Sequence, residues 1–115
     1  MSLNSGNLIL DLTFQLSLDI VKLTEELQRL HKYPVANQLV RCGTSIGANT
    51  RESQNAESKK DFIHKLKIAA KEADETEYWL LICKHSENYP DPGKLLSDIG
   101  SVKRVLGKII ASSHN

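Results

Sequence analysis

The chain has 115 residues, of which 40% are hydrophobic and 25% are charged, so it can fold as a single domain over residues 1–115 and is not disordered by composition. The formal net charge is +1, so overall charge alone does not predict nucleic-acid binding. No apolar run approaches the roughly 20 residues of a membrane span, and the opening MSLNSGN lacks the regions of a secretory signal, so neither a membrane protein nor a secreted one is expected.

The first predicted helix covers residues 11–32. Apolar residues alternate strictly from Leu8 to Ile20, which is a strand pattern and leaves an extended lead-in open at 7–10. A helical spacing runs through the same residues and alone explains the segment beyond Ile20: Leu12, Leu16, Ile20, Leu23, Leu27 and Leu30. The helix is therefore preferred, and Tyr33-Pro34 is expected to end it.

The second helix is predicted over residues 34–54, with Pro34 in its first turn. Its stripe is spaced by four and three residues: Val35, Leu39, Cys42, Ile46 and Asn49. Gly43 and Gly47 lie with Ala36 beside this stripe, although a glycine costs about 1 kcal/mol in a helix interior relative to alanine. They predict either a close helix crossing or a crowded core. Asn49 is expected to bond a neighbouring backbone rather than a ligand.

A third helix is predicted over residues 58–88 and a fourth over residues 92–112. Ser58 and Asp61 form an acidic variant of the capping box. The third stripe is Phe62, Leu66, Ala69, Ala73, Thr76, Leu80 and Cys83. Asp91 and Pro92 suit the start of the fourth helix, whose stripe is Leu95, Ile99, Val102, Leu106 and Ile109. Short connections favour antiparallel neighbours, so the predicted fold is all-α, an antiparallel up-down-up-down four-helix bundle.

Residues typical of enzymes and metal centres are sparse. Asp61 and His64 are the nearest match to a metal-binding Glu-x-x-His pair, and they point away from the apolar stripe. Cys42 and Cys83 lie on core stripes at heights that differ by on the order of 15–20 Å, so they are expected to be reduced thiols of a cytoplasmic protein. The sequence contains no phosphate loop and no nucleophile elbow. We therefore expect no catalytic residue, no metal, no cofactor and no enzymatic activity.

Charge is distributed unevenly along the second and third helices. Residues 34–71 carry seven basic and three acidic side chains, whereas residues 72–91 carry one basic and six acidic ones. The helix macrodipole favours the reverse order within the third helix, so local helix stability does not explain the pattern. Either basic and acidic surfaces pair between subunits, or the basic end holds nucleic-acid phosphates through Arg51, Lys59, Lys60, Lys65 and Lys67.

The third helix also carries apolar residues outside its stripe. Ile68, Trp79 and Ile82 cluster on a second flank, with Glu72 and Glu75 among them. An aromatic residue rimmed by charge is typical of a subunit interface, and this interpretation is favoured. The alternative is a wide core stripe, which would place the same side chains against the protein's own core.

Residues 41–82, RCGTSIGANTRESQNAESKKDFIHKLKIAAKEADETEYWLLI, resemble the signature of the bacterial four-helix bundle proteins encoded in intervening sequences of 23S ribosomal RNA genes. The resemblance extends over residues 12–110. Its markers here are Ser45, Ile46, Asn49, Glu52, Phe62, Leu66, Ala69, Glu75, Glu77 and Leu80. Thr50 and Ser53 depart mildly from the pattern. The accessory variability proteins of diversity-generating retroelements resemble the same family.

The resemblance implies a bundle that assembles as a homopentameric ring and has no defined active site. The retroelement relatives are markedly basic and bind nucleic acid and a reverse transcriptase, whereas this chain has a net charge of +1. Two non-enzymatic functions stay open. One is an accessory protein that binds RNA or DNA weakly through a ring of basic ends, with a reverse transcriptase or another protein as a further partner. The other is a protein–protein scaffold with no nucleic-acid role.

Overall fold

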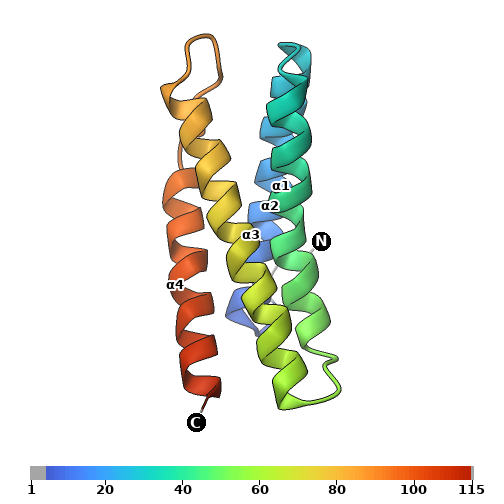
Figure 1. Cartoon of the computed structure of the whole chain (residues 1–115). Coiled ribbons are helices and arrows are strands. Elements are labelled where there is room, and N and C mark those ends of the chain that lie inside the picture. Colours follow the sequence, from blue (N-terminus) through green and yellow to red (C-terminus); the bar gives the residue numbers. More distant parts are fainter. Residues whose placement is uncertain (1–4, 115) are drawn as a thin grey trace.

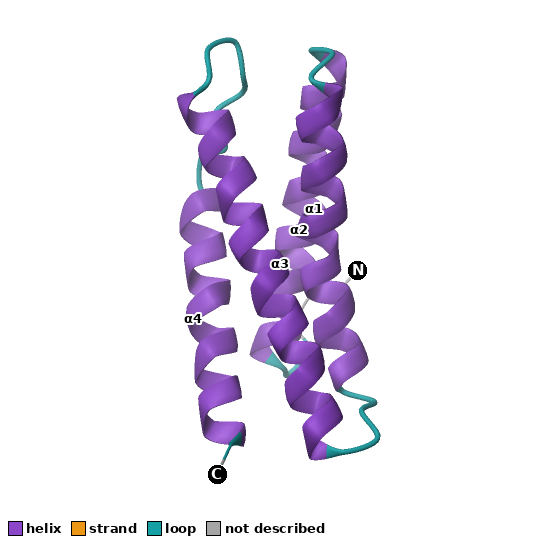
Figure 2. Ribbon diagram, in the orientation of Figure 1, coloured by secondary structure: helices purple, strands orange, loops and turns teal. Residues whose placement is uncertain are grey.

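The structure of the chain, a computed structural model, describes residues 5–114. It contains four long helices: α1 (Leu8–Arg29), α2 (Tyr33–Ser53), α3 (Lys59–His85) and α4 (Leu95–Ser113). Each helix packs against the next along the chain, and α1 also contacts α4, which closes the bundle (Figures 1 and 2). The predicted antiparallel up-down-up-down four-helix bundle is confirmed. The domain was predicted to span residues 1–115, and residues 1–4 and 115 of that span lie outside the described part of the chain.

The core is built from one apolar stripe of each helix. Its largest fully buried side chains include Leu16, Ile20, Leu27, Leu39, Ile46, Leu66, Leu80, Ile99 and Leu106. Residues spaced by three and four lie on one face of a helix, so these stripes meet at the bundle axis. Burying each such side chain stabilises the fold by about 1.5–3 kcal/mol. The predicted stripes of α3 and α4 are confirmed, except that Phe62 and Ile109 are only half-buried.

The ends of α1 differ from the prediction. The helix begins at Leu8, so the extended lead-in considered at 7–10 was wrong, and the Asn7 side chain caps it by accepting a hydrogen bond from Leu10 N at 3.4 Å. It ends at Arg29 rather than residue 32 because His31 adopts a left-handed conformation with φ 60°. Lys32 N then donates to Leu27 O at 2.8 Å, which is the bond of a Schellman motif.

The predicted start of α3 is confirmed, whereas that of α4 was wrong by three residues. Ser58 Oγ accepts a hydrogen bond from Asp61 N at 3.0 Å and caps α3. Asp91 Oδ1 instead accepts a hydrogen bond from Gly93 N at 2.7 Å, so it stabilises a turn rather than a helix end. Gly93 has φ +58°, a conformation that a right-handed helix cannot contain, and α4 begins only at Leu95. The end of α3 at His85 likewise precedes the predicted residue 88.

The two glycines of α2 lie where this helix meets α1, and each has a different reason. A Cβ atom on Gly43 would lie 2.8 Å from Ile20 Cγ2, so this position is a crowded part of the core. A Cβ atom on Gly47 would lie 3.3 Å from Thr13 O, so here the two backbones approach closely. Both interpretations of the sequence are therefore confirmed, one at each glycine.

Candidate nucleic-acid interface

The first turns of α3 and the carboxyl end of α4 lie together at one end of the bundle, the lower end in Figure 1. Antiparallel packing of these two helices brings the ends together, although about 50 residues separate them in sequence. Between them is an open groove with a volume of about 480 Å³. It is lined by Lys59, Lys60, Ile63, His64, Lys67, Ser113 and His114. We call this surface the basic groove.

Three of the five lysines and arginines predicted to bind phosphates line the basic groove, and two do not. Lys65 Nζ lies 3.6 Å from the Glu52 carboxylate, so it bridges α3 to α2. Arg51 lines a second groove, of about 510 Å³, which is formed by residues of α1 and α2, with Phe14 and Gly47 among them. The structure thus divides the expected cluster: three ammonium groups share the basic groove, whereas Lys65 pairs with Glu52 and Arg51 lies in the second groove.

His64 and His114 were not among the predicted phosphate-binding residues, yet both line the basic groove. His64 follows Lys60 by four residues and precedes Lys67 by three, so the spacing on α3 could have placed all three on one face. His114 follows α4 and arrives from the other end of the chain. Its place in the groove follows only from the packing of α4 against α3, which the sequence does not show.

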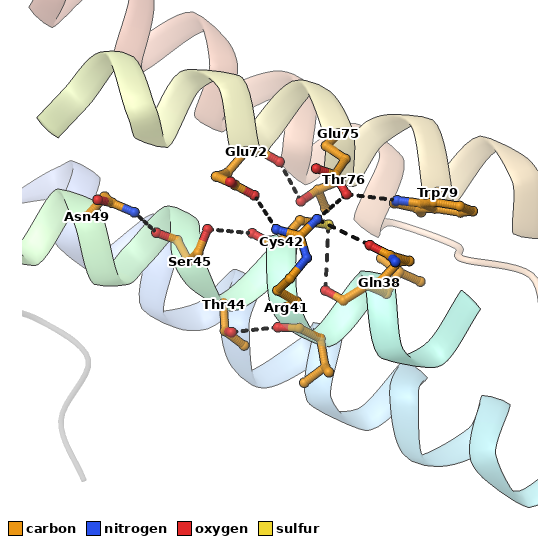
Figure 3. A network of polar contacts seen from close by, with 12 residues as sticks. Gln38, Arg41, Cys42, Thr44, Ser45, Asn49, Glu72, Glu75, Thr76 and Trp79 are labelled. Atoms are coloured by element: carbon orange, nitrogen blue, oxygen red, sulfur yellow. Dashed lines mark hydrogen bonds and ion pairs between the residues drawn. The ribbon is translucent and has the colours of Figure 1, made fainter. Parts of the chain in front are cut away.

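The acidic half of α3 is paired with basic residues of the same chain. On the α2 side, the Arg41 guanidinium donates to Glu75 and to Glu72, the latter at 3.3 Å (Figure 3). Hydrogen bonds from Arg41 and then from Trp79 hold the pKa of Glu75 below its usual value. The hydrogen bond to Glu75 raises the pKa of Arg41.

On the other side of α3, a lysine of α4 neutralises two further acids. Lys103 Nζ lies 2.9 Å from Asp74 and 3.1 Å from Glu77. Hydrogen bonds to Asp74 and Glu77 raise the pKa of Lys103. The acids of α3 therefore link this helix to α2 and to α4 within one chain. Pairing of this acidic half with another subunit's basic half is correspondingly disfavoured.

The residues predicted for a subunit interface lie half-buried along α3. Trp79 and Ile82 pack against the protein's own core, and Trp79 Nε1 donates to Glu75 at 3.1 Å. This arrangement favours the wide-stripe interpretation for these two residues, while Ile68 is half-buried outside the core cluster. Leu30, predicted on the apolar stripe of the first helix, is 46% exposed because it lies at the C-cap, so this part of the stripe was wrong. The other exposed large apolar side chains were not predicted to form an interface: Leu8, Leu18, Val21, Tyr33, Tyr78 and Leu81.

The family-type residues of α2 have local structural roles. Asn49 Nδ2 donates to Ser45 O at 2.9 Å, so this half-buried amide bonds a backbone carbonyl as expected, and that carbonyl belongs to its own helix. Ile46 is fully buried, and the stripe continues through buried Thr50 and Ser53 rather than through Asn49. The hydroxyl groups of Thr50 and Ser53 donate to carbonyl groups of their own helix, which satisfies them in the core.

Both cysteines are free and buried, as the sequence predicted. Burial raises the pKa of the Cys83 thiol to about 11 and also raises that of Cys42. A buried thiol with a raised pKa is a poor nucleophile, because the thiolate is the reactive species. Within residues 5–114, no three side chains of the metal-binding types are grouped to hold an ion. No helix of the same span is long and apolar enough to cross a membrane.

Comparison with known proteins places these features in a family. The chain matches the family model described as 23S rRNA-intervening sequence protein over residues 7–108. No curated protein matches it. A solved protein of unknown function from the S23 ribosomal protein family of Bacteroides thetaiotaomicron is similar in fold, with a TM-score of 0.84 and 38% sequence identity. The similarity covers 89% of this chain and 97% of that one. The chain described here belongs to the 23S rRNA-intervening sequence protein family.

Proposed function

We propose that the protein is a non-enzymatic, oligomeric bundle that binds the phosphate backbone of RNA or DNA weakly and without reading sequence. The basic groove supports this proposal, because three lysine side chains line one concavity at the end of the molecule. Four acids of the carboxyl half of α3 are engaged elsewhere, with Arg41 and Lys103, while Asp61 lies beside Lys60 and His64. A net charge of +1 therefore conceals a locally basic surface.

The groove is suited to phosphates rather than to bases. Among residues 5–114, Ile63 is its one large apolar lining residue and imidazole is the only aromatic ring that lines it, so these residues offer little surface on which bases could stack. Three lysine contacts predict a plot of log affinity against log salt with a slope of about −2 to −3 per groove. In a cytoplasmic homopentameric ring the groove would recur in each subunit, and several weak contacts on one strand would add.

A protein–protein scaffold with no nucleic-acid role is the second candidate. Exposed apolar side chains on α1 favour it, since Leu8 is 63% and Val21 is 40% exposed. Such side chains suit contact with another protein, which includes a second copy of the chain or a reverse transcriptase. The first candidate function predicts nucleic-acid binding that is lost when the charge of the groove is removed. The scaffold candidate predicts no nucleic-acid binding at all.

Fluorescence anisotropy with labelled RNA and duplex DNA, from about 50 to 300 mM salt, tests the proposal. Lys59→Glu/Lys60→Glu reverses two groove charges and is expected to abolish binding. Lys22→Glu/Lys84→Glu makes the same change in net charge at exposed positions outside the groove and serves as the matched control. No binding by the wild type at the lowest salt would leave the scaffold candidate. Equal loss in both variants would mean that overall charge, not the groove, is responsible.

A further inference from the structure

Two imidazole groups share the basic groove with the three lysines: His64 lies on α3, and His114 directly follows α4. We propose that His64 and His114 are part of the phosphate site and that their protonation strengthens nucleic-acid binding at acidic pH. This inference rests on the proposed function and adds two binding residues and a form of regulation to it. Both side chains are exposed, so a bound strand can reach them.

The charged groups around the imidazoles are mainly cationic. On α3, His64 lies among Lys59, Lys60 and Lys67, and it also borders a shallow hollow of about 310 Å³ with Ser58 and Asp61. From α4 the groove receives His114, and no charged group of α1 or α2 lines it within residues 5–114. Asp61 is the one carboxylate in either concavity among the described residues, and its Oδ2 accepts a hydrogen bond from Glu57 N at 3.2 Å.

This environment makes protonation and phosphate binding mutually dependent. While the groove is empty its ammonium groups give it a positive field, which disfavours a metal cation there. A phosphate in the groove reverses the local field and favours the imidazolium form. Because the two equilibria are linked, a proton on either histidine must in turn strengthen phosphate binding. Histidine changes charge between about pH 5 and 8, so the effect falls within that range.

Anisotropy at about pH 8 and about pH 5.5 measures this dependence directly. The probe is a labelled 5′-hydroxyl oligonucleotide, whose phosphodiesters keep their charge over this range. We expect the wild-type Kd at the lowest salt to be about tenfold lower at the acidic pH, as two added charges near a phosphate predict. The slope of log affinity against log salt should steepen by up to about two.

Two variants and a control assign the effect to these side chains. His64→Gln/His114→Gln should lose the pH dependence, so that its Kd at about pH 5.5 equals its own Kd at about pH 8. His64→Arg/His114→Arg should bind at about pH 8 as the wild type does at about pH 5.5. His85→Gln removes an exposed histidine at the other end of α3 and should retain the full dependence.

The outcomes separate this inference from the function on which it rests. Binding that does not change with pH, or a dependence that survives His64→Gln/His114→Gln, would overturn the inference and leave the proposed function standing. Absence of binding by the wild type at both pH values would overturn the proposed function itself.

Discussion

Gly43 and Gly47 set how closely α2 can pack against α1, and they do so by different contacts. At Gly43 the limiting atoms belong to the buried Ile20 side chain, whose branched carbon lies against the helix. At Gly47 the limiting atom is the Thr13 carbonyl oxygen of the facing helix. Neither neighbour is the far end of a flexible side chain, so neither can move aside at low cost. The propensity lost to glycine is offset here by dense packing.

Gly43→Ala is expected to destabilise the protein by about 1–2 kcal/mol, because overpacking of the core exceeds the gain in helix propensity. Gly107→Ala is the matched control, since a Cβ atom there meets no other atom within 4 Å. It should stabilise α4 by up to about 1 kcal/mol. Urea unfolding followed by circular dichroism measures both, and a gain in stability for both variants would mean that Gly43 is merely tolerated.

Helix ends show which parts of the elements could be predicted from sequence. The number, order and buried faces of the helices follow from apolar spacing, because only one face of each can reach the core. Where a helix begins or ends depends instead on the backbone conformation of one residue in the adjoining turn. His31 stops α1 by adopting a left-handed φ, which its sequence position does not reveal, and Gly93 delays α4 although Asp91-Pro92 looks like a helix start.

The residues of the basic groove likewise differ in how far the sequence could predict them. Lys59, Lys60 and Lys67 were accessible to prediction because they are close in sequence on one helix. His114 was not, because its neighbours come from packing between α3 and α4. Lys65 was misplaced because its ion pair with Glu52 crosses between helices, and spacing along one helix carries no information on such pairs.

Capping gives a prediction that distinguishes the two helix starts. Ser58→Ala removes an N-cap acceptor of α3 and should destabilise the protein by about 1 kcal/mol. Asp91→Ala removes only a bond within a turn and should cost clearly less. Thermal or urea unfolding of the two variants provides the comparison. A larger loss for Asp91→Ala would show that this residue does cap α4.

At the scale of the whole molecule, exposed apolar surface points to assembly. Tyr78 is 57% and Leu81 is 41% exposed, and both lie on α3 beside the half-buried Trp79 and Ile82. The Tyr78 and Trp79 rings meet edge to face with centroids 5.3 Å apart, so they extend one apolar surface outward. The exposed side chains of Tyr78 and Leu81 therefore border the second flank of α3 that the sequence predicted as an interface. A substitution at Leu81 is a better way to dissociate an oligomer than one at the half-buried Trp79.

We expect light scattering at micromolar concentration to report an assembly of about five subunits, as resemblance to the family implies. Leu81→Glu should reduce the measured mass towards that of the monomer while the helical circular dichroism signal persists, because this side chain lies outside the buried core. Trp79→Glu should instead weaken the bundle itself, since Trp79 packs against the core. A monomeric wild type would contradict the assembly.

Phosphate binding in the basic groove is tested most directly by amide chemical shifts. A ¹H–¹⁵N NMR titration of the isotope-labelled protein with a short single-stranded oligonucleotide should shift amides over residues 59–67 and 113–114, the two segments that line the groove. Those shifts should disappear as salt is raised. Shifts confined to the groove of Arg51, Phe14 and Gly47, or no shifts at low salt, would contradict the assignment of phosphate binding to the basic groove.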